Sequence, residues 1–171
     1  MGFNISNIKM YYSGAASASG IQTNIENSLG GYISSSEIPN ASFNNLFTDI
    51  SGTDTISGTT IYKALFVKNT DVSMWNNGKI FIYSMVGSSY EDIYFGAESH
   101  VGGYIQTISD KYTSPTGVSW YNPDDIESGI SIGDITPQNF FGFWIKKVII
   151  PSSGTGEKIH SITIAFSADV Y

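Results

Sequence analysis

Two histidines are the side chains of this sequence best suited to acid–base catalysis. Ser99 precedes His100, but the Gly-x-Ser-x-Gly turn that exposes a serine nucleophile is absent. His160 alternates with apolar neighbours, as expected of a strand residue that faces solvent or a partner subunit. We therefore predict no catalytic residue among them.

Acidic side chains gather in one loop, which contains Asp124, Asp125 and Glu127, and Glu91-Asp92 opens a predicted strand. A glycosidase needs two carboxylates on opposite sides of a cleft, and the sequence places no two of these acids in that way. Calcium needs six to eight oxygen ligands, and the loop spacing does not match an EF-hand. We interpret these acids as solvated turn residues and predict no metal site and no cofactor.

The aromatic residues offer a different chemistry. Trp120 and Tyr121 adjoin the acidic loop, and Trp75 lies at a predicted turn. Flat rings beside Asn and Asp can stack on the apolar face of a sugar, but the same residue types are enriched in cores and subunit interfaces. The sequence favours core and interface, and a glycan platform formed by these three residues is the alternative.

The charge composition argues against binding of nucleic acids and phosphate groups. All eight cations are lysines, the net charge is -7, and charged residues make up 13% of the chain. Lys146-Lys147 is too small for a nucleic-acid footprint, and Gly102-Gly103 is not followed by a helix as a phosphate loop would be. There is no cysteine, which excludes disulfides and thiolate metal sites. We predict no nucleic-acid partner.

Membrane insertion is not indicated either. No stretch approaches the roughly 20 apolar residues that a spanning helix needs. The first fifteen residues contain no apolar run of signal-peptide length.

Residues 59–171 read as consecutive short strands, and amphipathic helices do not alternate with them. This pattern predicts an all-β sandwich, either Ig-like or a jelly roll. Asn76-Asn77-Gly78 predicts a tight hairpin turn. The strands predicted at 140–150 and 158–166 are expected to form a final hairpin across the loop Pro151–Glu157.

Residues 1–58 are rich in Ser, Gly and Asn, and we predict that they form an irregular N-terminal arm. The spacing of Phe43, Leu46, Phe47 and Ile50 predicts one short helix at about 42–50. Phe43, Leu46 and Phe47 are the predicted subunit interface. If they pack on the chain's own sandwich instead, removal of residues 1–50 should unfold the protein.

Several short segments follow one another in a recognisable order between residues 28 and 150. They are Ser28-Leu29-Gly30-Gly31, Asn44-Asn45-Leu46-Phe47, Tyr62 to Thr70, Ile93-Tyr94-Phe95-Gly96, Ile105 to Ile108, Pro115 to Val118, Ile132-Gly133-Asp134 and Phe143 to Lys147. In this order they resemble uncharacterised virion proteins of tailed phages. The resemblance implies a structural protein without catalytic residues.

The expected function is therefore a non-enzymatic virion component, such as a capsid decoration protein or a head or tail accessory subunit. Its expected partners are the major capsid protein or neighbouring virion proteins, and it is expected to be a homo-oligomer in the assembly. Two alternatives stay open: a carbohydrate-binding or receptor-binding module, and a filament subunit whose arm donates a strand to its neighbour.

Overall fold

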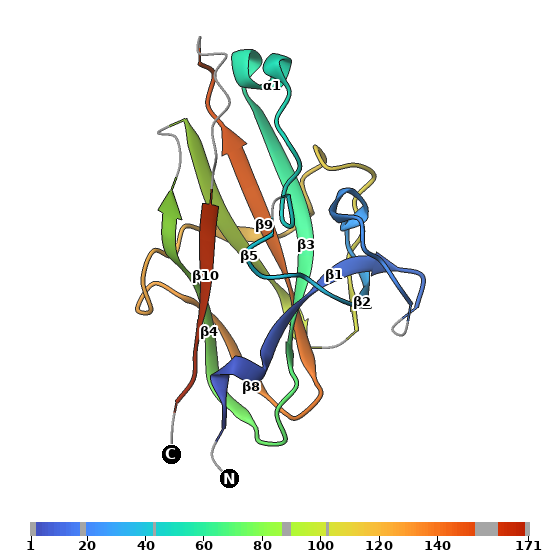
Figure 1. The fold of residues 1–171 in the computed structure, drawn as a ribbon, viewed down its shortest axis with the longest axis vertical. Helices are drawn as coiled ribbons and strands as arrows, with labels where there is room; N and C mark the ends of the chain where they lie inside the picture. Colours follow the sequence, from blue (N-terminus) through green and yellow to red (C-terminus); the bar gives the residue numbers. More distant parts are fainter. Residues whose placement is uncertain are drawn as a thin grey trace.

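The computed structural model describes residues 3–17, 20–42, 44–86, 90–101, 103–152 and 161–169, with the backbone alone for 99–101. It confirms an all-β sandwich of two antiparallel sheets (Figure 1). The strands are β1 Ile8–Ala15, β2 Gly31–Glu37, β3 Thr59–Asn69, β4 Trp75–Val86, β5 Glu91–Val101, β6 Tyr104–Ile105, β7 Ser119–Tyr121, β8 Ile130–Ile135, β9 Phe140–Ile149 and β10 Ser161–Ser167. The helical turns are α1 Gly52–Ser57 and the 3-10 turns η1 Ile5–Asn7 and η2 Ile25–Asn27. No helix in these described ranges is long and apolar enough to cross a membrane.

The seven-stranded sheet has the order β6-β2-β1-β3-β9-β5-β7, and the three-stranded sheet has the order β10-β4-β8. The chain crosses between the sheets from β3 to β4 to β5, and again from β8 to β9 to β10.

The predicted C-terminal hairpin is wrong. β9 is a central strand that pairs with β3 on one side and β5 on the other. Both of its backbone edges are therefore occupied, so β10 crosses to the second sheet and pairs with β4 instead.

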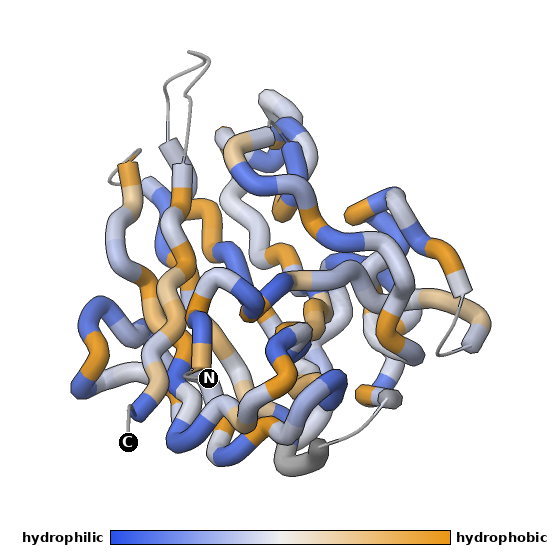
Figure 2. The backbone as a smooth tube through the Cα atoms, turned by 60° about the horizontal axis from the view of Figure 1, so that its bottom comes forward, coloured by the Kyte–Doolittle hydropathy of each residue, from blue (hydrophilic) through white to orange (hydrophobic). Residues whose placement is uncertain are grey.

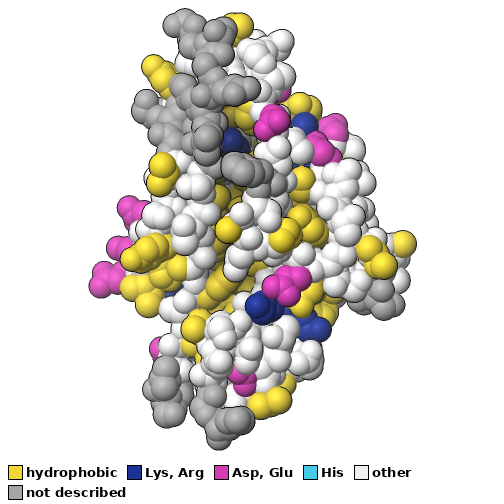
Figure 3. Space-filling model, in the orientation of Figure 1, with side chains coloured by type: hydrophobic (Ala, Val, Ile, Leu, Met, Phe, Trp, Pro, Cys, Tyr) yellow, Lys and Arg dark blue, Asp and Glu magenta, His cyan; other side chains and the backbone are white. Residues whose placement is uncertain are grey.

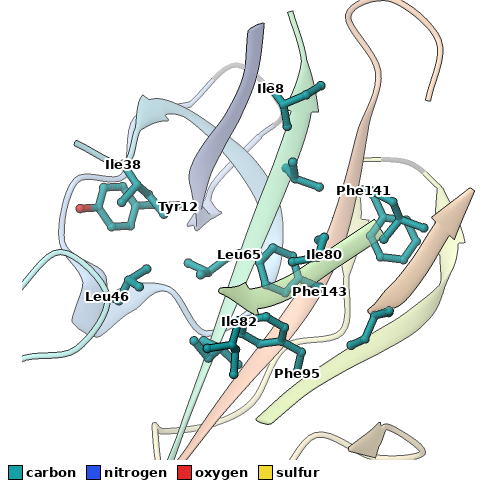
Figure 4. Packing of buried hydrophobic residues seen from close by; sticks show 14 of the residues in the cluster. Ile8, Tyr12, Ile38, Leu46, Leu65, Ile80, Ile82, Phe95, Phe141 and Phe143 are labelled. Carbon is teal, nitrogen blue, oxygen red and sulfur yellow. The ribbon is translucent and has the colours of Figure 1, made fainter. Parts of the chain in front are cut away.

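The core lies between the two sheets, and we call the side of the large sheet that faces it the inner face. Leu65, Phe143 and Phe95 project from neighbouring strands of the large sheet toward Ile80 and Ile82 of β4 (Figure 4). Hydrophilic and hydrophobic residues follow one another at short intervals along the chain in Figure 2, as expected where alternate side chains enter a core. Along β3, Leu65 and Val67 face the main core, whereas Ala64 and Phe66 lie on the opposite side of the sheet.

A second apolar cluster covers part of the opposite, outer face of the large sheet. Ala64, Phe66 and Trp144 form it together with Ile33 and Ile105. The chain after β6 runs over this cluster and is held to it by backbone hydrogen bonds. Ile108 donates to Leu29 O, and Lys111 O accepts from Tyr62 N. Because both faces of β3 and β9 are covered, β9 reads as a nearly continuous apolar run rather than an alternating one.

The N-terminal segment differs from the predicted arm, because β1 and β2 are part of the large sheet. β1 pairs with β3 through five consecutive residue pairs, from Ile8 opposite Asn69 to Tyr12 opposite Leu65. Its other edge pairs with β2. Ile8 and Tyr12 are buried in the main core, so this segment completes the sandwich.

The helix predicted at 42–50 is absent from the described residues of that stretch, which form turns and bends. Ala41 and Asn44 have φ of 54° and 56°, in the left-handed region, which interrupts a right-handed helix. The helix begins later, at Gly52. Ser51 is its N-cap, and the Ser51 hydroxyl accepts a hydrogen bond from Asp54 N.

The hairpin turn predicted at Asn76-Asn77-Gly78 is also wrong, since these residues lie inside β4. Asn77 has φ of 47°, and the pairing of β4 with β8 shifts register here. A Cβ on Gly78 would lie 2.7 Å from the Trp75 ring and 2.9 Å from Ile132. Glycine is therefore needed at this register shift, because any side chain at position 78 would collide with the buried indole of Trp75.

Candidate functional site

The histidines and Ser99, the candidates for acid–base catalysis, have no described side chains. His160 is not among the described residues, and the side chains of Ser99 and His100 are not described. The acidic loop is held by hydrogen bonds between its own residues. Asp125 Oδ1 accepts hydrogen bonds from both the backbone N–H and the hydroxyl of Ser128, each at 2.7 Å. The backbone hydrogen bond from Ser128 lowers the pKa of Asp125 and keeps it charged. Across the described ranges, no three His, Cys, Asp or Glu side chains are placed to hold a metal.

Lys63 is fully buried on the inner face of β3 and belongs to a network centred on Glu26. Glu26 lies 3.3 Å from Lys63 Nζ and 2.9 Å from Lys111 Nζ, and it accepts a hydrogen bond from the Thr48 hydroxyl. Burial alone would raise the pKa of Glu26. The hydrogen bonds from Lys111 and Thr48 and the charge of Lys63 outweigh burial and lower this pKa to about 2. Burial lowers the pKa of Lys63, although Glu26 opposes the change.

This network joins four parts of the chain, and its buried amine is enclosed. Lys63 has the lowered pKa of a reactive lysine but no exposed surface through which a substrate could reach it. We therefore interpret the network as a structural tie between η2, β3 and the loops that carry Thr48 and Lys111.

The two adjacent lysines of β9 lie on opposite faces of the sheet. Lys147 faces inward, where its Nζ is 2.9 Å from Glu91 Oε2 and 5.4 Å from the centre of the Phe47 ring. Lys146 faces outward, in register with Tyr62 of β3 and Tyr94 of β5. They do not form a single basic spot.

The predicted interface residues pack on the chain itself. Leu46 is buried in the main core beside Tyr12 and Ile38 (Figure 4). Phe47 is half-buried against the same core, and Phe43 lies outside the described residues. Leu46 is not available to a second subunit in this fold, which corrects its assignment to the interface.

The three residues predicted as a glycan platform are not brought together. Trp75 is fully buried, and its Nε1 donates a hydrogen bond to Ser167 O at 2.7 Å. Trp120 and Tyr121 are successive residues of β7, so they point to opposite faces of the sheet. Trp75 is therefore a core residue, and Trp120 has other neighbours than those predicted.

Trp120 belongs to what we call the outer aromatic cluster, which consists of Tyr62, Tyr94, Trp120 and Lys146. The Tyr62 and Trp120 ring centres are 5.5 Å apart, at an interplanar angle of 47°. Lys146 Nζ lies 4.0 Å from the centre of the Tyr94 ring and 5.0 Å from that of Trp120. All four side chains are half-buried, so each keeps some surface exposed to solvent. Aromatic rings thus border an ammonium group at the solvent surface.

Sequence reasoning missed Tyr62, Tyr94 and Lys146 as members of one cluster. Alternation along each strand predicts which face a residue occupies, but the cluster depends on the register between β3, β9 and β5. That register was not available from strand patterns alone.

The second candidate site is the free edge of β10. Among the described strands, only β4 pairs with it, so it ends the small sheet. Its inner row, Ile162, Ile164 and Phe166, is half-buried against the main core. Figure 3 shows hydrophobic side chains at the surface in the middle of the face that β10 borders in Figure 1. A further strand could pair with this edge and cover apolar surface.

The other strands that end the described sheets are protected from such pairing. β6 and β7 have only two and three residues. β8 carries Asp134 and a register irregularity near Gly133, whose φ is 72°. The seven residues of β10 include no charge, proline or glycine. Short length, charges and bulges are the devices that block edge-to-edge pairing. β10 is neither short nor charged, and the extra residue at the one register shift in its pairing with β4, Tyr83, lies on β4 rather than on β10.

Comparison with known proteins adds no family. No protein-family model matches the sequence, and no curated protein matches it. Function must be argued from the geometry.

Proposed function

We propose that this protein is a non-enzymatic structural subunit of a tailed-phage virion, and that it binds its neighbour by strand addition to β10. The observation that supports the proposal most is the free edge of β10, with uncharged residues and a half-buried apolar inner row. Main-chain hydrogen bonds to such an edge supply affinity, and pockets for alternate side chains supply specificity. The resemblance of residues 28–150 to tailed-phage virion proteins supplies the setting.

The proposed occupant is an extended segment of a neighbouring virion protein, with the major capsid protein as the first candidate. The low charge of the chain, 13% of residues, suits close packing in an assembly. Donation of the chain's own N-terminal strand is less favoured, because β1 already pairs with β2 and β3. That pairing would have to be broken before β1 could enter another subunit.

A charge placed on the inner row of β10 tests the proposal. Ile162→Lys should reduce incorporation into particles at least tenfold, because an inward-pointing lysine opposes strand addition. Tyr83→Lys is the matched control, since Tyr83 is 72% exposed on β4, one strand inward from the free edge. Incorporation is measured by quantitative mass spectrometry of purified particles.

Thr163→Lys provides a second edge variant if Ile162→Lys fails to fold, because Thr163 is exposed. Circular dichroism of each purified variant establishes folding. Normal incorporation of a folded β10 variant would contradict strand addition at this edge, whereas equal loss with Tyr83→Lys would indicate a general effect of charge and would contradict it as well.

A further inference from the structure

The outer aromatic cluster contains a cation without an acidic partner among the described residues. Four other lysines, Lys9, Lys63, Lys111 and Lys147, each form an ion pair with a glutamate. Lys146 instead contacts the rings of Tyr94 and Trp120. Partial burial lowers its pKa. Ring faces offset part of the cost of desolvating an ammonium, but they do not neutralise its charge.

The indole of Trp120 lies close against the sheet because β5 has a glycine beneath it. A Cβ on Gly96 would lie 3.2 Å from two carbons of the Trp120 ring and 2.3 Å from Val118. Gly96 is the cross-strand partner of Trp120, so the absence of a side chain lets the ring approach the backbone. The ring packs against the outer apolar cluster and is half-buried, so part of it remains open to solvent.

This combination has the chemistry of a sugar site with one charged group. An aromatic ring fixed on a sheet offers an apolar surface to the C–H face of a pyranose, and Tyr62 packs against the same indole. The ammonium of Lys146 lies 5.0 Å from the Trp120 ring centre, within the span of one sugar ring and its substituent. A carboxylate on that ring would supply the counter-ion that Lys146 lacks.

We propose that the outer aromatic cluster binds a carboxylated sugar, with the pyranose stacked on Trp120 and the carboxylate paired with Lys146. The ligand class covers uronic acids and sialic acids, which share this chemistry. The site lies on the large sheet and does not involve β10, so this binding function is independent of strand addition. It would add attachment to an acidic glycan to the assembly role.

Binding is tested by isothermal titration calorimetry on the full chain at pH 7 and about 0.15 M salt, where the Debye length is about 8 Å. Screening limits the long-range repulsion between an acidic ligand and a chain of net charge -7. The probes are an oligogalacturonate with its carboxyl-reduced counterpart, and sialyllactose with lactose. At least one acidic probe should bind ten times more tightly than its neutral counterpart.

Three variants, with one control, assign the binding to the cluster. Trp120→Ala and Lys146→Gln should each weaken binding at least tenfold, while Lys146→Arg should stay within a few-fold of the wild type because it keeps the charge. Lys68→Gln is the matched control, since Lys68 lies on the same face of β3 six residues from Tyr62. Its removal should leave the affinity unchanged.

Several results would overturn the proposal: no binding of either acidic probe, equal binding of the neutral probes, or full affinity in folded Lys146→Gln. Should Trp120→Ala fail to fold, Lys146→Gln decides alone. Lys146 is only half-buried, so its substitution should leave the fold intact. Ile162→Lys should bind the glycan normally, which separates failure of this site from failure of strand addition.

Discussion

At the scale of single residues, the inner face of the large sheet holds two buried lysines where an apolar core would be expected. Lys63 and Lys147 are each matched by one glutamate, Glu26 and Glu91. A buried ion pair gives little net stability, because the attraction has to offset the cost of desolvating both charges. Loss of one partner is costly, because the other charge then stays buried and unpaired.

Substitution of Glu26 and substitution of Lys63 should change the free energy of unfolding in opposite directions. Glu26→Gln should lower the free energy of unfolding by roughly 3 kcal/mol, because it leaves Lys63 buried without a counter-ion. Lys63→Met should be neutral or stabilising by about 1 kcal/mol, because Glu26 keeps Lys111 and Thr48 as partners. Urea denaturation monitored by circular dichroism measures both changes.

The exposed pair of Lys9 and Glu37 provides the control for the same chemical change. Both side chains of this pair are more than a third exposed, so Glu37→Gln should change stability by less than about 1 kcal/mol. A Lys63→Met variant less stable than Glu26→Gln would show that the buried ammonium itself stabilises the fold.

The sequence is least informative about the burial of individual residues in the candidate sites. Trp120 and Trp75 were both predicted as core or interface residues, with a shared glycan platform as the alternative, and Trp120 is half-buried. Trp75 has the same residue type and also lies near polar neighbours, yet it is fully buried. The difference depends on which sheet face each tryptophan occupies, and this is decided by pairing between distant strands.

At the scale of elements, the strands were largely predictable and their partners were not. The run Thr60 to Val67 and the apolar run from Phe140 are strands, as alternation and β-propensity indicate. The C-terminal hairpin and the hairpin turn at Asn76-Asn77-Gly78 were wrong, because tertiary pairing of β9 and β4 overrides the local turn preference. The helix predicted at 42–50 failed for a similar reason, since burial of Leu46 is achieved by a turn instead.

The N-terminal segment is predicted to be essential for folding. Deletion of residues 1–50 removes β1, β2 and Leu46, and it exposes the apolar surface of β3. The truncated chain should show no cooperative thermal transition by circular dichroism. A native-like transition would instead identify residues 1–50 as a detachable arm.

Leu46→Ala gives a graded form of the same test. Truncation of a buried leucine should cost about 2–5 kcal/mol, and this loss would place Leu46 in the core in solution. Ile21→Ala is the matched control, because Ile21 is 76% exposed and its truncation should have little effect.

At the scale of the whole molecule, β10 is the one long, uncharged strand that ends a sheet among the described strands. Charged residues make up only 13% of the chain, a composition that fits the proposed assembly role and also occurs in secreted β proteins. The segment Ser161–Ser167, which lacks charge, proline and glycine, carries the sequence pattern of a strand that pairs readily. The sequence did not indicate that this strand lies at the edge of the small sheet. The predicted hairpin paired it with β9 instead of β4.

Backbone hydrogen exchange of β10 tests most directly whether its edge makes the proposed contact with a neighbouring virion protein. The amides of Ser161–Ser167 are compared between the isolated protein and the same protein in purified particles, with β9 as the internal reference because both of its edges are already paired. Strand addition predicts that edge amides of β10 exchange at least tenfold more slowly in particles while those of β9 change little. Equal exchange of β10 in the two states would contradict it.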